Sequence, residues 1–161
     1  MVIEVVDTNI WVTIDKLPPH SEAEWQCVLA CFEWGKAFND AGDTRKIAAD
    51  ISYKILREYF ANIKKGGLAE QYLRTLLTQP ITRIEFVEIP LDAQGYAILP
   101  SELLIDDKDD RKWVAVALKF EPPLPILNAT DTDWAKDKSK LVQANIQVTE
   151  LCGDYIQEKL K

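Results

Sequence analysis

The chain has 161 residues, of which 47% are hydrophobic and 28% are charged, as in an ordinary globular domain, and we expect one domain over residues 1–161. Its 19 Lys and Arg against 26 Asp and Glu give a formal net charge of −7, which excludes a strongly basic nucleic-acid-binding surface but not a local basic rim. No apolar run approaches the ~18 residues that a membrane span needs, and the N-terminus has no basic flank or cleavage site. We therefore expect a cytoplasmic protein without a membrane partner.

Strand-like and helix-like segments alternate along the first half of the chain. The apolar run VIEVV (2–6) is typical of a strand, and Ser21 followed by Glu24 is the capping-box pattern that opens a helix. The further elements expected here are the rest of that helix as far as Gly42, a strand at 46–51, a helix at 52–65, a break at the glycines 66–67 and a helix at 68–79.

The second half continues the alternation. The elements expected here are a strand at 82–90, an acidic turn and helix at 106–120, a strand at 125–130, a helix at 131–143, a strand at 146–151 and a closing helix from 153. Strands separated by helices favour a parallel sheet with right-handed crossovers and helices on both faces. The predicted fold class is therefore α/β, as a three-layer α/β/α sandwich around a central, mainly parallel five-stranded sheet.

Several acidic residues follow the predicted strands. Asp7 follows the first strand, Asp131 and Asp133 follow the fourth, Asp110 opens the helix before the fourth, and Glu58 lies on the helix after the second. A sheet of this kind has its ligand site in the crevice beyond the carboxyl ends of its strands. We therefore expect these carboxylates to gather at one edge of the sheet.

Gathered carboxylates repel one another. Each close pair costs ~4 kcal/mol at an effective dielectric constant of ~20. Neither VVDTNIWV (5–12) nor ILNATDTDW (126–134) contains a lysine or histidine that would offset this charge. A hard divalent cation is the remaining compensator, and oxygen ligands select Mg²⁺ or Mn²⁺ over zinc.

The stretches VVDTNIWV, ILREYF, DDRKWVAVAL and ILNATDTDW resemble, in order and spacing, the four acidic motifs of the PIN-domain family, over nearly the whole chain. Members of this family are compact α/β/α domains, many of them Mg²⁺- or Mn²⁺-dependent ribonucleases. The residues that the resemblance assigns are the catalytic metal ligands Asp7, Glu58, Asp110 and Asp131, the accessory ligand Asp133, and the supporting residues Thr8 and Asn9.

The resemblance also implies a reaction and partners. The expected function is hydrolysis of RNA phosphodiester bonds by a metal-activated water, and many bacterial members are toxins of toxin–antitoxin pairs, so RNA, an antitoxin protein and a second copy of the chain are the expected partners. A non-catalytic PIN-like module that binds RNA or protein is the alternative. Substrate-binding residues stay unassigned; the cations considered for this role are Arg45, Lys64, Lys65, Arg111 and Lys112.

The register of the third motif is open. Asp106, Asp107 and Asp109 compete with Asp110 for the ligand position. We prefer Asp110 because it directly precedes the amphipathic run, where the helix dipole favours an acid, although Asp110 can also act as a plain helix cap. The other three are expected in a solvated turn.

The remaining candidate acids also have structural interpretations. Asp7 can cap the segment that follows it, and Asp131 can cap the next helix. Glu58 can pair with Lys54 one helical turn before it.

The cysteines and the single histidine carry little functional signal. Cys27 and Cys31 stand four residues apart on one helix face, where core packing is favoured over a metal-binding pair, and Cys152 makes the number odd. His20 is expected to flank a helix start.

Overall fold

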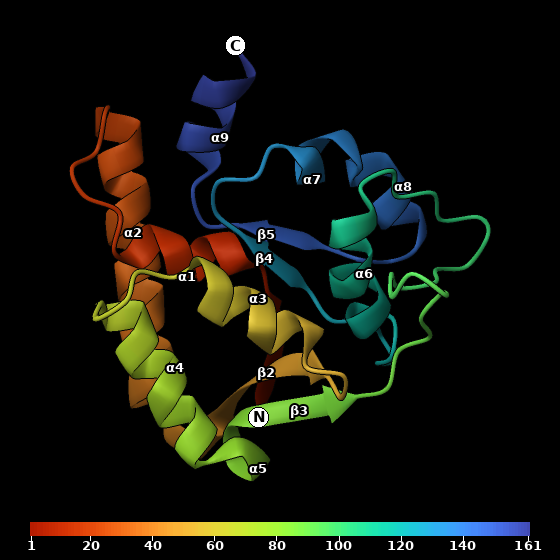
Figure 1. Ribbon diagram of the computed structural model, residues 1–161. Coiled ribbons are helices and arrows are strands. Elements are labelled where there is room, and N and C mark those ends of the chain that lie inside the picture. Colours follow the sequence, from red (N-terminus) through yellow and green to blue (C-terminus); the bar gives the residue numbers. More distant parts are fainter.

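The computed structural model describes residues 1–161 as a five-stranded parallel sheet flanked by helices (Figure 1). The strand order is β3-β2-β1-β4-β5. The strands are β1 (Val2–Val6), β2 (Arg45–Asp50), β3 (Ile84–Val87), β4 (Ile126–Asn128) and β5 (Val148–Glu150). The predicted α/β/α sandwich is confirmed, and its sheet is parallel throughout.

Helices occupy the crossovers between these strands, and one more helix, the last in the chain, follows the last strand. They are α1 (Thr8–Ile14), α2 (Glu22–Asp40), α3 (Lys54–Asn62), α4 (Leu68–Thr78), α5 (Pro80–Arg83), α6 (Arg111–Ala117), α7 (Asp133–Lys136), α8 (Lys138–Gln143) and α9 (Gly153–Leu160), with 3₁₀ turns η1 (Gly42–Thr44) and η2 (Lys108–Asp110). None of these helices has the length and apolar character needed to cross a membrane.

The order of the strands assigns the helices to two layers. The chain adds β2 and β3 on one side of β1, then returns to add β4 and β5 on the other side. Because such crossovers are right-handed, reversing their direction moves the connecting helices to the opposite face of the sheet. Figure 1 accordingly shows α1 to α4 gathered on one side of the sheet and α6 to α8 on the other.

Local sequence explains most element boundaries and a few departures from the prediction. The hydroxyl of Ser21 accepts the backbone N–H of Glu24 at 3.1 Å, which starts α2 as expected. The chain after Val6 turns directly into α1, a helix that the apolar pattern did not predict. Pro80 starts the one-turn helix α5, which shortens the expected strand at 82–90, and the helix expected at 131–143 is divided at Asp137 into α7 and α8.

An aromatic cluster fixes the helices beneath the carboxyl ends of the strands. The Trp11 ring lies edge-on against Trp34, Phe38 and Tyr59, with ring centroids 5.1, 6.1 and 5.9 Å away. The Tyr59 hydroxyl donates to the carbonyl oxygen of Val6 at 2.5 Å, which joins α3 to the last residue of β1. Trp11 is thus a core residue, and the cluster makes a rigid support for the segments that follow β1.

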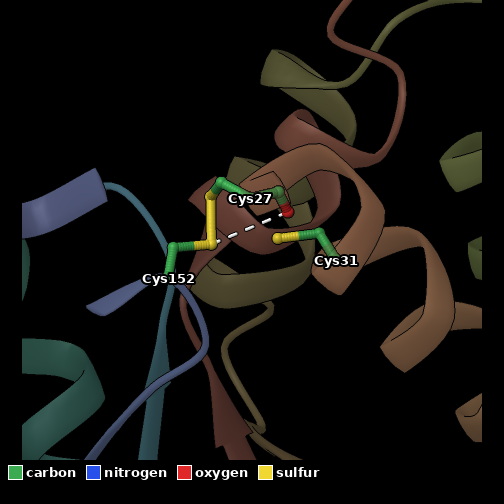
Figure 2. A group of neighbouring side chains, drawn as sticks. All are labelled: Cys27, Cys31 and Cys152. Atoms are coloured by element: carbon green, nitrogen blue, oxygen red, sulfur yellow. Dashed lines mark hydrogen bonds between the residues drawn. A yellow bond between two sulfur atoms is a disulfide. The ribbon is translucent and has the colours of Figure 1, made fainter. Parts of the chain in front are cut away.

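A disulfide adds a connection that the sequence did not reveal. Cys27 on α2 is bonded to Cys152 at the start of α9, and Cys31 lies beside them as a buried free thiol (Figure 2). Both cysteines of α2 are packed in the core, as expected, but the bond of Cys27 to a partner 125 residues away was not predicted. The bond ties α9 to the helical layer on the α2 side of the sheet.

Candidate metal centre at the carboxyl edge of the sheet

The expected ligand crevice lies between β1 and β4, where the direction of the crossovers reverses. Val6 and Leu127 are paired across these two strands, so the chains leaving β1 and β4 emerge side by side. Asp7 and the 129–133 segment follow directly. This is the position in an open α/β sheet at which ligands usually bind.

Asp7 is a buried carboxylate with only two hydrogen-bond donors. It is 6% exposed, accepts the indole N–H of Trp134 at 2.6 Å, and accepts the backbone N–H of Asn9 at 3.4 Å as the N-cap of α1. Burial raises the pKa of Asp7 to about 7; the Trp134 N–H opposes this rise and the charge of Asp131 adds to it. The capping role considered from the sequence is present, but its hydrogen bond is long and leaves the buried charge largely uncompensated.

Asp50 shows what a structural acid at the same edge looks like. It ends β2, is fully buried, and its two oxygens accept the backbone N–H groups of Lys54 and Ile55, each at 2.9 Å. Both oxygens are therefore satisfied by the start of α3. Asp7 has no comparable pair of short backbone hydrogen bonds.

A second set of carboxylates gathers at the start of α6. Asp107, Asp110 and Asp133 each offer an oxygen, and these oxygens lie within 4.8 Å of one another. Burial raises the pKa of Asp110 to about 8, and the charges of Asp131, Asp107, Asp7 and Asp133 contribute. Asp110 occupies the N-cap position of α6 without accepting a capping hydrogen bond, so the plain-cap interpretation has no support.

The acids of the turn before α6 differ in whether their carboxylates lie near the other candidate ligands. Asp106 and Asp109 are exposed, as expected for a solvated turn. Asp107 is also exposed and accepts the backbone N–H of Asp109 at 2.9 Å, yet its carboxylate belongs to the group with Asp110 and Asp133. Both Asp107 and Asp110 thus point toward the same space.

Asp131 and Asp133 continue the cluster from the β4 side. Burial raises the pKa of the half-buried Asp131, whose carboxylate accepts the backbone N–H of Asp133 at 2.8 Å. Asp133 pairs with Lys136 one turn later at 2.8 Å. Asp131 is not the cap of the next helix, as considered from the sequence, because Thr132 holds the N-cap position of α7; Asp131 lies one residue earlier and contacts the first helical N–H through one oxygen only.

Glu58 is the one candidate ligand that meets a buried cation. Its carboxylate lies 2.8 Å from the ammonium of Lys112, which is 8% exposed, and it accepts the hydroxyl of Thr8. A lysine outside the two stretches considered from the sequence thus offsets one of the acids, and the pairing of Glu58 with Lys54 is wrong. Lys112 also donates to the carbonyl oxygen of Asp109 at 2.5 Å, which fixes its position.

Two asparagines hold the β1 and β4 ends together. The Asn9 side chain accepts the backbone N–H groups of Ala129 and Thr130 at 2.8 and 3.2 Å and donates to Asn128 at 2.9 Å. Asn128 is fully buried and donates to the Asp131 carbonyl oxygen and to Glu150, both at 2.8 Å. Asn9 therefore orients the loop that carries Asp131.

Two residues of this site were missed by sequence reasoning. Asn128 is the last residue of an apolar strand, where a buried amide signals a hydrogen-bond hub only once its partners are known. Trp134 lies in the core at 1% exposure, and its N–H also holds Asp7. The only signal for this role is the residue type, because the N–H of a buried tryptophan usually has a hydrogen-bond partner.

The donor set suits a hard divalent cation. The candidate ligands are carboxylate oxygens, and those of Asp7, Asp110 and Asp131 are desolvated and form no ion pair, although the charge of Lys159 acts on Asp131. Groups in this condition hold protons or bind a cation. Oxygen-only coordination fits Mg²⁺ or Mn²⁺ and excludes a typical zinc site.

The cations expected near the substrate are mostly elsewhere. Arg45 starts β2 at the opposite end of the sheet and pairs with Glu4 at 2.9 Å. Lys64 and Lys65 are exposed beyond the end of α3, and Arg111 donates to the carbonyl oxygen of Ile105 at 2.8 Å. Lys112 alone among these expected cations contacts a candidate ligand.

Comparison with known proteins adds no further constraint. No protein-family model matches the chain, and no curated protein or solved structure matches it either. The resemblance to the PIN-domain family therefore depends on the four motifs alone, and it stays a prediction.

Proposed function

We propose that the protein is a Mg²⁺- or Mn²⁺-dependent endoribonuclease of the PIN-domain type. The observation that carries this proposal is that Asp7, Asp110 and Asp131, between β1, β4 and α6, are desolvated and form no ion pair. A structural role gives no reason to bury Asp7 and crowd Asp110 in this way, because ion pairs or backbone N–H groups would stabilise the fold better.

Each acidic residue has a distinct part in the proposed site. Asp7, Asp110 and Asp131 would hold the ion, with Asp133 at the rim beside Lys136. The bound ion would supply a water of lowered pKa and stabilise the developing charge on the phosphate and on the leaving 3′ oxygen. Trp134 keeps the Asp7 carboxylate in one orientation, and Asn9 keeps the Asp131 loop against it.

Glu58 differs from the other proposed ligands. With Lys112 at 2.8 Å and the Thr8 hydroxyl beside it, its carboxylate is held in place and its charge is offset. In the proposed enzyme the Glu58 carboxylate would accept a proton, or a hydrogen bond from a water, through the lone pairs that Lys112 and Thr8 leave unused. Lys112 would then contribute positive charge near the phosphate.

The Lys112–Glu58 pair also favours a second candidate function. An internal cation that neutralises one of the expected ligands suits a non-catalytic module that binds RNA or protein through the same crevice. An antitoxin and a second copy of the chain are proposed as partners on the family resemblance alone. A cytoplasmic location is likewise a proposal.

The test is cleavage of labelled single-stranded and hairpin RNAs with Mn²⁺, with Mg²⁺ and with EDTA. We expect products bearing a 5′-phosphate with either ion and none in EDTA. Asp110→Asn is the matched loss-of-charge variant, and Glu85→Gln on β3 is the control outside the site. Intact RNA in all metal-containing reactions, with RNA binding retained, would favour the non-catalytic module instead.

A further inference from the structure

A second hollow opens beside the acidic site, on the far side of Glu58. It encloses about 330 Å³ between the start of α3, the turn at 92–97 and the segment 108–112. Glu58, one of the candidate ligands, and its partner Lys112 both line this cleft, so the cleft borders the acidic site. We refer to it as the basic cleft, for the side chains described next.

The cleft concentrates positive charge on an acidic protein. Its lining contains the four cations Lys54, Arg57, Lys108 and Lys112 against the two carboxylates Glu58 and Asp109. Lys54, Arg57 and Lys108 form no ion pair, although the chain has seven more acidic than basic residues. Unpaired cations that converge on one hollow are available to an anionic ligand.

The opposite wall of the cleft is a rigid turn. One Asp92 oxygen accepts the backbone N–H groups of Gln94 and Tyr96 at 2.9 and 3.0 Å, and a bridge between Leu91 and Ala97 closes the base. Gly95 has φ +89° and lies so close to α3 that an added Cβ would be 3.1 Å from the Lys54 ammonium. The turn is therefore fixed in position against the cation before any ligand arrives.

An aromatic ring completes the wall. The half-buried Tyr96 lines the cleft, and the ammonium of Lys108 lies 5.4 Å from its ring centroid. A base of an unpaired strand can stack on such a ring while its phosphate meets the neighbouring cations.

We propose that the basic cleft binds a phosphodiester group of single-stranded RNA next to the one at the carboxylates. This proposal rests on the proposed nuclease function and deepens it, because it names where the strand continues from the acidic site. The contact of the Thr8 hydroxyl with Glu58 brings the residue after Asp7 to the border of the cleft. If one phosphate of the RNA lies at the metal ligands, a neighbouring phosphate would lie among Lys54, Arg57 and Lys108.

The test measures binding of a fluorescent 12-nucleotide oligouridine in EDTA, where no cleavage is expected. The variants are Lys54→Gln, Arg57→Gln, Lys108→Gln and the triple variant. The matched control is Lys64→Gln with Lys65→Gln, which removes exposed positive charge beyond α3. We expect single cleft variants to bind roughly three- to tenfold more weakly and the control to bind nearly as wild type. The slope of log Kd against log salt concentration should fall by about 0.7 for each phosphate that the variant no longer neutralises.

The outcomes separate this proposal from the nuclease proposal. If the wild type cleaves RNA, the cleft variants should raise KM and leave kcat nearly unchanged. If the wild type does not cleave RNA but the cleft variants still lose binding, the cleft proposal stands and the nuclease proposal fails. Equal binding by the triple variant and the wild type, or equal losses in the control, would overturn the cleft proposal even with full nuclease activity. An oligothymidine DNA should depend on the same residues, and a dependence limited to RNA would contradict phosphate recognition.

Discussion

The charged side chains at the two ends of the central sheet differ in whether they have ion-pair partners. Toward the amino ends of the strands, Glu4 on β1 pairs with Arg45 on β2 at 2.9 Å, and Lys46 on β2 pairs with Glu85 on β3 at 3.1 Å. These pairs join neighbouring strands and leave the charges neutralised. Each contributes little free energy on its own, but none of these groups needs an external partner.

At the carboxyl ends the acids outnumber their partners. Lys112 offsets Glu58 and Lys136 offsets Asp133, whereas Asp7, Asp110 and Asp131 form no ion pair. The pKa values of these three are raised, chiefly by burial. The difference teaches that the fold can pair its charges where they are structural, and the unpaired edge supports the proposal that an external cation binds there.

The largest expected effect is on the cleavage rate when Asp110, one of the unpaired acids, is substituted. If Asp110 is a metal ligand, Asp110→Asn should lower the Mn²⁺-dependent cleavage rate at least about 100-fold, because loss of even a supporting group costs 10- to 100-fold. Asp107→Asn should cost less, since Asp107 is exposed at the rim. Glu4→Gln, at the paired end, should leave the rate unchanged.

Rates of these variants also settle the register of the third motif. A larger loss in Asp107→Asn than in Asp110→Asn would move the ligand position to Asp107. A comparable loss in Glu4→Gln would remove the distinction between the two ends of the sheet.

The second effect is on the pH dependence of stability without metal. Burial raises the pKa of Asp7 to about 7 from 3.8, so the folded protein keeps a proton that the unfolded chain has lost. The free energy of unfolding should therefore fall as the pH rises from about 4 to about 7, by up to about 4 kcal/mol from Asp7 alone. Thermal melts in EDTA across this range measure it.

Metal and Asp7→Asn provide the controls for that pH dependence. Mn²⁺ at a hundredfold excess over its Kd should raise the stability by about 2.7 kcal/mol at neutral pH and flatten the profile. Asp7→Asn should also flatten the profile in EDTA, whereas Glu4→Gln should keep it. A wild-type melting temperature that rises between pH 5 and 7 would contradict an uncompensated acidic edge.

The sequence predicted the layers of this fold and the candidate acids because both depend on short-range pattern. Strand and helix periodicity located β1, β2, β4 and the carboxylates that follow their ends. The motifs also placed Asn9 beside Asp7 as a supporting residue, and the structure supplies its hydrogen bonds to the β4 loop.

What the sequence did not predict depends on contacts between distant segments. The ammonium of Lys112 reaches Glu58, the indole of Trp134 reaches Asp7, and Cys27 reaches Cys152, over 54, 127 and 125 residues. No local periodicity encodes such pairs. The basic cleft was missed for the same reason, because two segments far apart in the sequence contribute its cations.

A smaller expected effect comes from the Cys27–Cys152 bond, which holds α9 close to the acidic edge. The Lys159 ammonium on α9 donates to the carbonyl oxygen of Thr130 at 2.5 Å, next to Asp131. Reduction should lower the free energy of unfolding by about 2 to 4 kcal/mol, because the bond closes a long loop in the unfolded chain. Melts with and without dithiothreitol measure this loss.

Thiol titration of the denatured, unreduced protein is the companion measurement. One thiol, from Cys31, is expected when the bond is formed (Figure 2). Cys31→Ala should keep its response to dithiothreitol, and Cys27→Ala with Cys152→Ala should lose it. Three thiols in the denatured, unreduced protein would contradict the bond.

The smallest expected effect comes from the single hydrogen bond between the Trp134 N–H and Asp7. Trp134→Phe keeps a buried ring but removes the N–H that Asp7 accepts at 2.6 Å. Trp34→Phe is its matched control, since the Trp34 N–H is buried without a hydrogen-bond partner. Both variants lose similar ring volume, so the difference between them isolates the bond to Asp7.

That difference should depend on pH. The N–H stabilises ionised Asp7 more than protonated Asp7, so the excess loss in Trp134→Phe should be about 1–2 kcal/mol above pH 7 and smaller at pH 5. Removing the N–H also raises the pKa of Asp7 further, because this hydrogen bond opposes the effect of burial. Mn²⁺ binding by Trp134→Phe should therefore begin at a higher pH than in the wild type, since the ion competes with the proton. Melts in EDTA and Mn²⁺ titrations at pH 5 to 8 would show both shifts. Equal, pH-independent losses in the two variants would mean that Trp134 only packs against Asp7.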